Sequence, residues 1–293
     1  YLHDALLGHF GEEEGNRLHH HYSEGFRSDY LETYTPEVAV HDIQQMEKLR
    51  QPGDIGMALF RPLDAADNLL RFKLYSFGNP VALSEALPML ENMGLKVIDE
   101  HPSKVRSPDG NLIWIHDFGM LHTEQNLQLK QVKEIFQDAF PLIFRGKVSN
   151  DGFNRLTLRA RLSWRRVLIL RAYSRYLRQV RSTFSHDYMI QALVNNAEIA
   201  TLLIELFEAR FDPQREQARA ETVAGIEAQI FTSLDKVASL DEDRIIRSFS
   251  GAISATLRTN YYQTDINGKL KDYLSFKLDS SRVPEFTTAL PSL

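Results

Sequence analysis

Apolar residues recur at helical spacing through the first 50 residues. They include Leu6, Phe10, Leu18, Tyr22, Phe26 and Tyr30, and Ile43, Met46 and Leu49 continue the pattern. A helix places residues three or four apart on one face. Residues 1–52 are therefore predicted to form a helical segment, with a break at Thr35-Pro36 and an end before Pro52-Gly53.

The pattern changes beyond residue 53. Met57–Arg61 and Leu69–Phe77 are short apolar runs typical of strands. A helix should follow, with Ser84 as its N-cap and Gly94 as its stop. If Ser84 is the cap, Pro88 must lie in the first turn, where its missing N–H costs least.

Two further apolar runs, residues 95–101 and 112–118, flank Asp109-Gly110, which is a strong hairpin signal. An amphipathic helix is predicted over residues 127–146. The order strand, strand, helix, strand, strand, helix is most of a βαββαβ unit with an extra strand in front, although its final strand is not evident. Residues 53–148 are therefore predicted to form an α+β domain of this type.

Residues 149–264 are predicted to be helical. Asp212-Pro213 indicates one helix start, with proline at the first position, and Ser239 with Glu242 indicates a capping box at another. Residues 265–293 contain a strand-like run, Tyr273–Leu278, and a tail.

Charge and composition narrow the class of protein. The 293 residues carry a net charge of −5, with a pI of about 6.1, which argues against a nucleic-acid partner. Cysteine is absent, which excludes thiolate zinc sites and suits a reducing compartment, so we expect a cytoplasmic protein. No apolar run approaches the roughly 20 residues of a spanning helix, and no membrane partner is expected. The chain begins with Tyr1 rather than methionine, so we expect it to be a piece of a longer chain.

Residues 159–181 carry eight arginines and no acidic residue. At about 100° per residue the earlier arginines gather on one side and the later ones on nearly the opposite side. This predicts two helical pieces, or one helix contacted on different sides along its length, and not the single basic face of a membrane-surface helix. Residues 187–243 contain twelve acidic residues against four basic ones. We therefore expect arginines paired with acidic neighbouring helices; an acidic ligand is the alternative, ahead of nucleic acid.

Other candidate sites are weak. His19, His20 and His21 point in three directions on a helix, and His116 and His122 would be about 20 Å apart on a strand, so no metal site is predicted. Neighbours on a strand face opposite sides, so neither Asp99-Glu100 nor His116-Asp117 forms an acid–base pair. The sequence has no G-x-G-x-x-G, G-x-x-x-x-G-K-[ST] or G-x-S-x-G motif. No catalytic, cofactor-binding or metal-binding residue is predicted.

Several stretches together resemble one family. They are RFKLYSFGNPVALSEALPMLENMGLKVIDEHP, WIHDF, DGFNRLTL, WRRVLILRAYSRYLRQV, FEARFDP, SLDEDRIIRSF, ATLRTNYYQ and YLSFKLDSSRVP. Their sequence and order resemble the large bacterial NAD-specific glutamate dehydrogenases, in which ACT-like domains and helical motifs precede a catalytic domain. The resemblance implies an ACT-like domain at residues 53–148 and a scaffold helix carrying Arg171, Tyr173, Arg175, Tyr176 and Arg178.

The resemblance also implies a regulatory or scaffolding fragment upstream of the catalytic domain. The full-length enzyme would oxidise L-glutamate with NAD to 2-oxoglutarate and ammonium, while the fragment would be inactive and hold no cofactor. Its expected partners are the catalytic domain of the same chain, further copies in a homo-oligomer and an amino-acid effector. The alternative is a stand-alone ACT-type ligand-binding or interaction module without enzyme activity.

The tail carries one structural expectation. Leu274, Phe276 and Leu278 share one face of the predicted strand, and Lys277 lies on the other. A lone strand needs a sheet to bury its apolar face, so these three residues are predicted to join the substrate domain, with Arg258 and Asn260 near the junction. The alternative is that the tail packs on the chain's own helices. The sequence does not assign the roles of Arg258, Asn260 and Lys277.

Overall fold

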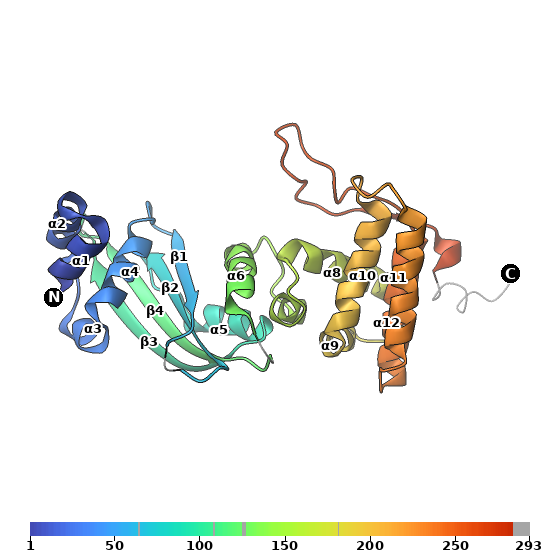
Figure 1. Cartoon of the computed structure of the whole chain (residues 1–293), viewed down its shortest axis with the longest axis horizontal. Helices are drawn as coiled ribbons and strands as arrows, with labels where there is room; N and C mark the ends of the chain where they lie inside the picture. The colour runs from blue at the N-terminus through green and yellow to red at the C-terminus, as the bar shows by residue number, and fades with distance from the viewer. Residues whose placement is uncertain (64, 108, 125–126, 181, 284–293) are drawn as a thin grey trace. The chain divides into compact units, whose positions relative to one another are not determined.

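The computed structural model describes residues 1–63, 65–107, 109–124, 127–180 and 182–283. The chain divides into two compact units, Tyr1–Asn150 and Asp151–Leu293 (Figure 1). As predicted, the fold is α+β, with an ACT-like sheet flanked by helices and a largely helical region after it.

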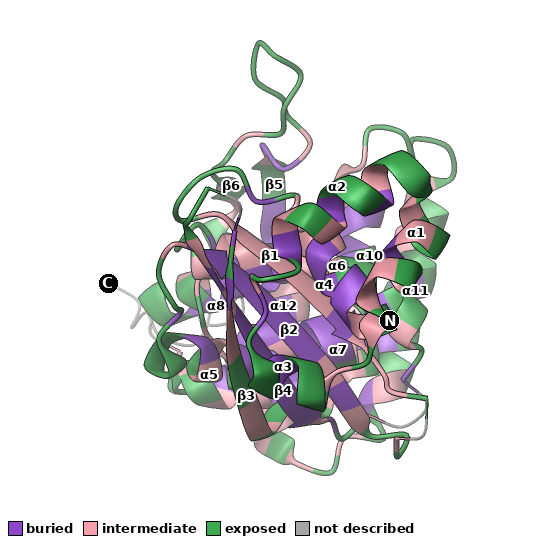
Figure 2. Cartoon of the chain, turned by 90° about the vertical axis from the view of Figure 1, so that its left-hand side faces the viewer, coloured by how far each residue is buried: buried purple, intermediate pink, exposed green. Residues whose placement is uncertain are grey.

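The first unit is built on a four-stranded antiparallel sheet. Its strands are β1 Ile55–Phe60, β2 Leu69–Phe77, β3 Lys96–Arg106 and β4 Leu112–Leu121, in the order β1-β2-β4-β3. The hairpin predicted at Asp109-Gly110 is confirmed, because β3 and β4 pair antiparallel and Gly110 adopts a φ of 78°. The central strands β2 and β4 are buried along most of their length (Figure 2).

The extra strand at the start of the domain, β1, takes the position in the sheet that the final strand of a βαββαβ unit would occupy. A βαββαβ unit places its last strand beside its first, on the side away from the hairpin. Here β1 pairs antiparallel with β2 at that position, from Ile55 opposite Ser76 to Phe60 opposite Arg71. The sheet is therefore complete, with its edge strand supplied from the start of the domain.

Helices α5 Leu83–Asn92 and α6 Leu129–Phe144 cover one face of this sheet. The face is apolar because alternate residues of β2 point toward the helices. Phe72 contacts Phe136 and Phe140 of α6 edge-on, with ring centroids 5.4 and 5.0 Å apart. These rings form the centre of the domain core.

The opposite face of the sheet is covered by an N-terminal helical layer of α1 Leu2–Phe10, α2 Glu12–Tyr22, α3 Ser28–Thr33 and α4 Pro36–Met46 (Figure 1). The break predicted at Thr35-Pro36 separates α3 from α4, with Pro36 as the first residue of α4. The helices bury Leu6, Leu18, Tyr22, Phe26, Tyr30, Val40, Ile43 and Met46 against Tyr75, Phe77, Val105, Ile113 and Ile115 of the sheet. The sheet is thus a middle layer between two sets of helices.

The second unit packs helices around one apolar core. They are η1 Gly152–Arg155, α7 Leu156–Arg159, α8 Trp164–Gln179, α9 His186–Asn195, α10 Ala197–Phe211, α11 Arg219–Leu234 and α12 Leu240–Ala255. Most of the arginine-rich segment is one helix, α8, which carries arginines of both groups, so the alternative of one helix contacted on different sides is the one that the structure shows there. The chain turns before it at Arg161, with a φ of 54°, between α7 and α8. The core includes Ile169, Leu170, Tyr173, Leu203, Phe207 and Phe249.

A two-stranded antiparallel sheet closes the second unit. Strand β5 Thr256–Thr259 follows α12 directly and pairs with β6 Phe276–Leu278. A short 3-10 helix, η2 Ser280–Arg282, follows β6. Helix was predicted through residue 264, and this was wrong for β5, because α12 ends at Ala255 and Thr256 already has extended backbone.

Three other local predictions can be compared with the structure. Gly94 follows the last turn of α5 with a φ of 86°, as the predicted stop requires. The predicted cap at Ser84 is wrong, because α5 begins at Leu83 after Ala82; Pro88 consequently lies inside the helix and not in its first turn. The start predicted at Asp212-Pro213 is also wrong, since α11 begins at Arg219.

Candidate functional site

Polar residues on the central strand β2 form the most distinctive feature of the first unit. Arg71, Lys73 and Tyr75 alternate with Leu70, Phe72 and Leu74, so they point toward the N-terminal helical layer. Lys73 is 2% exposed. A buried charge needs a partner and further hydrogen bonds, and α3 and α4 provide them.

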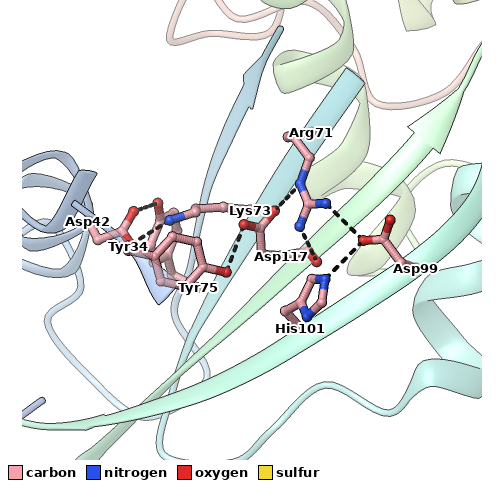
Figure 3. A network of polar contacts seen from close by, with 8 residues as sticks. All are labelled: Tyr34, Asp42, Arg71, Lys73, Tyr75, Asp99, His101 and Asp117. Carbon is pink, nitrogen blue, oxygen red and sulfur yellow. Dashed lines mark hydrogen bonds and ion pairs between the residues drawn. The ribbon is translucent and has the colours of Figure 1, made fainter. Parts of the chain in front are cut away.

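Asp42 of α4 is the centre of this buried network (Figure 3). Lys73 Nζ donates to Asp42 Oδ2 at 2.6 Å, and Tyr75 donates its hydroxyl hydrogen to Asp42 Oδ1 at 2.7 Å. Tyr30 of α3 donates to the same carboxylate. Three donors thus satisfy one buried carboxylate, and they tie α3 and α4 to the middle of the sheet.

The tyrosines of the network remain protonated. Burial, together with the negative charge of Asp42, raises the pKa of Tyr30 and of Tyr75 well above the usual value. Both hydroxyls therefore act as donors to Asp42 over the whole physiological pH range. The network carries one positive and one negative charge, so it is neutral as a unit.

A second ion-paired group lies on the same face of the sheet, around Arg71. Its Nε donates to Asp117 Oδ1 at 2.9 Å, and its Nη1 donates to Asp99 Oδ1 at 2.8 Å. Tyr34 donates to the other oxygen of Asp117 at 2.9 Å. Burial lowers the pKa of Arg71, but the hydrogen bond to Asp117 and the charges of Asp117 and Asp99 outweigh it, so the pKa is raised.

A glycine makes room for this second group. Gly119 of β4 lies opposite Arg71 in the register, and a Cβ there would clash with the carboxylate of Asp99. The Asp99 carboxylate occupies that space and reaches Arg71, with His101 Nε2 3.4 Å from its Oδ1. The exposure of the group increases from β4 to β3. The side chain of Asp117 on β4 is 3% exposed, and that of Asp99 on β3 is 39% exposed.

Asp99-Glu100 and His116-Asp117 were the two candidate acid–base pairs in the sequence. The two members of each pair lie on opposite faces of the sheet, as predicted. Asp99 and Asp117 face the N-terminal helices and share Arg71, whereas Glu100 and His116 meet on the other face at 2.8 Å. Pairing across strands thus joins residues that are not neighbours in sequence. Within the described residues, no group of three or more histidines and carboxylates could hold a metal ion.

Three arginines of residues 159–181 show how the expected pairing with acidic neighbouring helices turns out, and it holds for Arg166. Arg166 of α8 binds Glu208 of α10 with two hydrogen bonds, at 2.8 and 3.0 Å. Arg171 is 1% exposed and binds both oxygens of Asp151, at 2.8 and 2.9 Å, so one acidic partner comes from before the segment and not from residues 187–243. Arg165 donates to the backbone oxygen of Tyr261 at 2.7 Å.

The tail residues pack within the second unit. Leu274, Phe276 and Leu278 are half-buried against the helical core, and Phe276 stacks on Tyr173 with centroids 4.5 Å apart. Asn260 closes the hairpin by donating to the Tyr273 carbonyl and accepting from the Ser275 amide. We had assumed that the strand at Phe276–Leu278, β6, has no partner strand within the chain. This was wrong, since β5 pairs with it. Arg258 and Lys277 are exposed.

Asp42 and Lys73 were not among the residues predicted from the sequence. Their signal was present in LLRFKLYSF, where basic residues alternate with apolar ones in a run too apolar for a surface strand. In such a strand, charged residues on one face imply a second covered face with buried partners.

Among the described residues no single helix is long and apolar enough to cross a membrane. Helices α9 and α10 meet the length and composition test only as a pair, and that pair is bent by 99°.

Four family models match the chain, in the order of its elements. Glutamate dehydrogenase helical motif 2 matches residues 5–49, and the ACT3 domain of the same enzymes matches residues 54–132. Helical motif 3 matches residues 148–213, and the catalytic domain of bacterial NAD-glutamate dehydrogenase matches residues 229–293. The N-terminal layer and the sheet are thus two family modules, and the Asp42–Lys73 pair connects them.

Three similar proteins align with nearly the whole chain, and all three are NAD-specific glutamate dehydrogenases. NAD-specific glutamate dehydrogenase of Halomonas elongata is 40% identical over 290 residues, which are 99% of this chain and 18% of that protein. The enzymes of Pseudomonas aeruginosa and Mycobacterium tuberculosis are 40% and 33% identical over 98% and 92% of the chain, and the chain spans 18% and 17% of their length. The chain thus matches a run of consecutive modules from a multidomain dehydrogenase. It belongs to the family of bacterial NAD-specific glutamate dehydrogenases.

Proposed function

We propose that the chain is a non-catalytic regulatory and scaffolding part of an NAD-specific glutamate dehydrogenase. The whole enzyme oxidatively deaminates L-glutamate to 2-oxoglutarate and ammonium with NAD, and NAD binds outside this chain. The order of the matched modules carries the proposal, because a helical motif, an ACT domain and a second helical motif fill residues 5–213 ahead of the match to the catalytic domain.

The buried network around Asp42 supports a scaffolding role. It joins α3 and α4 to β2 through a charged pair in which each side chain is 2% exposed. A pair of this kind specifies one arrangement, because any shift of the layers leaves a buried charge without its partner. The ACT-like sheet and its helical cover therefore move as one body, which is what a regulatory domain needs in order to pass on a ligand-induced change.

We further propose a division into a helical segment at 1–52, an ACT-like domain at 53–148, a helical domain at 149–264 and a strand and tail at 265–293. The match to the catalytic domain begins at residue 229, within α11. Residues 229–264 would then belong both to the helical domain, by packing, and to the beginning of the catalytic region, by sequence. The partners that we propose are the remainder of the catalytic domain, further copies of the enzyme and an amino-acid effector.

NADH formation tests the proposal. The purified 293-residue chain, supplied with L-glutamate and NAD, should show no rise in absorbance at 340 nm, whereas the full-length enzyme from the same gene should show one. The full-length enzyme is the matched control for substrate and buffer. Measurable NADH from the chain would contradict the proposed non-catalytic role.

A stand-alone ACT-type binding or interaction module is the second candidate. It is favoured by the completeness of the first unit, whose sheet has all four strands and is covered on both faces. The source gene separates the two candidates, because a stop codon directly after Leu293 would leave a module without a catalytic domain.

A further inference from the structure

The connection between β5 and β6 forms a hairpin arm, residues 262–273. It extends away from the helices of the second unit (Figure 1 and Figure 2), and residues 263–270 are all exposed. Ile266 at the tip is 101% exposed, and Leu270 and Tyr273 on the returning side are exposed too. Single apolar residues on a surface need no explanation, but three on one protruding arm indicate a surface that binds a partner.

Hydrogen bonds hold the tip of the arm in one conformation. The Asp265 carboxylate accepts from the amides of Asn267 and Lys269 at 2.8 and 2.9 Å, and the Asp265 amide donates to the Lys269 carbonyl at 2.7 Å. Gly268 completes the turn with a φ of 76°, which glycine adopts without strain. A tip that is ordered before it meets its partner loses less conformational entropy on binding than an irregular loop does.

The base of the arm is fixed to the helical core. Arg165 of α8 donates to the backbone oxygen of Tyr261 at 2.7 Å, and its guanidinium lies 4.7 Å from the centre of the Tyr261 ring. Tyr261 is buried and contacts Phe207 edge-on. Across the base, the Asn260 side chain donates to the Tyr273 carbonyl at 2.9 Å. A displacement of the arm therefore reaches α8 through its base.

The comparisons with the family favour one partner for the arm. The arm lies within residues 229–293, which match the catalytic domain of bacterial NAD-glutamate dehydrogenase, and the Halomonas elongata enzyme is more than five times as long as this chain because the chain spans 18% of it. In a polypeptide of that kind, the part of the catalytic domain that follows residue 293 is tethered to the arm. Tethering gives it a higher effective concentration than a second copy has.

We propose that residues 262–273 are a docking arm, which inserts Ile266 into an apolar pocket of the remainder of the catalytic domain in the same polypeptide. The inference rests on the proposed function, in which the chain is part of a longer enzyme. It adds the surface through which the helical unit contacts the catalytic domain. Burial of Ile266 stabilises the contact, and Arg165 couples the contact to α8.

The variant Ile266→Asp tests the tip in two settings. Ile266 is fully exposed in the 293-residue chain, so the midpoint of its urea unfolding should not change. In the full-length enzyme the new carboxylate would enter an apolar pocket, and the rate of NADH formation from L-glutamate and NAD should fall by about tenfold or more. A lower midpoint for the chain would assign the tip a structural role within it, and an unchanged rate for the enzyme would show that nothing docks there. Either result overturns the proposal.

The matched control for this variant is Leu63→Asp. Leu63 is 103% exposed, as Ile266 is, but it lies in the first unit and outside the arm. The control should leave both the unfolding midpoint and the rate of NADH formation unchanged. An equal loss of rate in the control would attribute the effect of Ile266→Asp to the added charge and would overturn the docking role.

A photo-crosslink identifies the partner. The full-length enzyme with p-benzoylphenylalanine in place of Ile266 should, after irradiation, be joined to a peptide that follows residue 293, and the denatured product should keep the mass of one subunit. A product with the mass of two subunits would assign the arm to a second copy, and a crosslink to residues 1–260 would place its contact within this chain. Both results overturn the proposal. So does an equal yield of the same product from the probe in place of Arg178, which is an exposed residue of α8.

Hydrogen exchange of the unaltered protein covers the case in which a variant does not fold. The amides of residues 262–273 should exchange at least about tenfold more slowly in the full-length enzyme than in the 293-residue chain, because docking covers the arm. Equal exchange rates would overturn the proposal. These results are separate from the proposed function, which fails only if the chain itself forms NADH.

Discussion

The two units each bury a basic side chain, but they pair it differently. Lys73 in the first unit and its partner Asp42 are both 2% exposed, and the pair joins a helix to the middle of a sheet. Arg171 in the second unit is 1% exposed, while its partner Asp151 is 20% exposed. Asp151 also caps η1, because its side chain accepts a hydrogen bond from the Phe153 amide.

This difference separates two uses of a buried charge. At Arg171 one end of the pair reaches water, and the interaction fixes the start of the helical unit against α8. At Lys73 neither end reaches water, and the interaction connects the two sequence modules that match residues 5–49 and 54–132. A fully dry pair is the more demanding of the two, because loss of one member leaves a charge that nothing can hydrate.

Asp42→Ala should have the largest effect. It leaves Lys73 charged and dry, and the free energy of unfolding of the first unit should fall by about 3–5 kcal/mol. The two tryptophans lie one in each unit, so urea unfolding followed by Trp114 fluorescence in a Trp164→Phe background reports this unit alone. Asp138→Ala, at an exposed position on α6, is the control. The double change Asp42→Leu with Lys73→Met should cost less than Asp42→Ala, and an equal cost would argue against charge burial as the cause.

Arg171→Met should have a smaller effect on the second unit. It removes two hydrogen bonds to Asp151 and one to Asn154, but water can hydrate the freed carboxylate. We expect a loss of about 2–3 kcal/mol, measured through Trp164 fluorescence in a Trp114→Phe background. Arg178→Met changes an exposed arginine on the same helix and should stay within about 0.5 kcal/mol. A loss larger than that of Asp42→Ala would reverse the comparison.

Tyr75→Phe should cost about 1–2 kcal/mol at neutral pH, because Asp42 loses one donor. The same change alters the pH dependence. Folding raises the pKa of Tyr75, so above about pH 10 the unfolded chain loses this proton and the folded chain keeps it. The unfolded state then binds fewer protons and stability falls as pH rises. In the variant this fall should be shallower by about 1.4 kcal/mol per pH unit, and equal slopes would contradict the assignment.

Gly119→Ala should have the smallest effect. The new Cβ would displace the Asp99 carboxylate from Arg71, but Asp99 is partly exposed and Asp117 still pairs Arg71. A cost of about 1 kcal/mol is expected. In an Asp99→Ala background the clash is gone, so the same change should cost less, and additive effects in this double-mutant cycle would show that the contact is unimportant.

Local signals in the sequence were enough for most of the first unit. The apolar alternation, Gly94 and Asp109-Gly110 predicted strands, a stop and a hairpin, because these features depend on neighbouring residues only. The place of β1 beside β2 could not be predicted, since strand order depends on contacts between distant segments. The capping error at Ser84 has a similar origin, because packing of α5 on the sheet sets its start more than the weak cap preference does.

The candidate site was harder to predict than the fold. Asp42 pairs with a residue on a strand 31 positions away, and no spacing rule connects a helix to the face of a sheet. Ser239 shows the limit of local rules well. Its hydroxyl caps α12 as expected, but the Glu242 side chain bonds Asn195 and Asn196 and does not complete the predicted capping box.

The most direct test of the account is the activity and assembly of the full-length enzyme that carries Asp42→Ala. We predict that NADH formation from L-glutamate and NAD changes, or that the mass of the assembly by light scattering changes, while the Asp138→Ala enzyme behaves like the parent. Trp114 fluorescence would confirm that the first unit is loosened in the same sample. A loosened first unit together with unchanged activity and unchanged mass would contradict a regulatory or scaffolding role for this part of the chain.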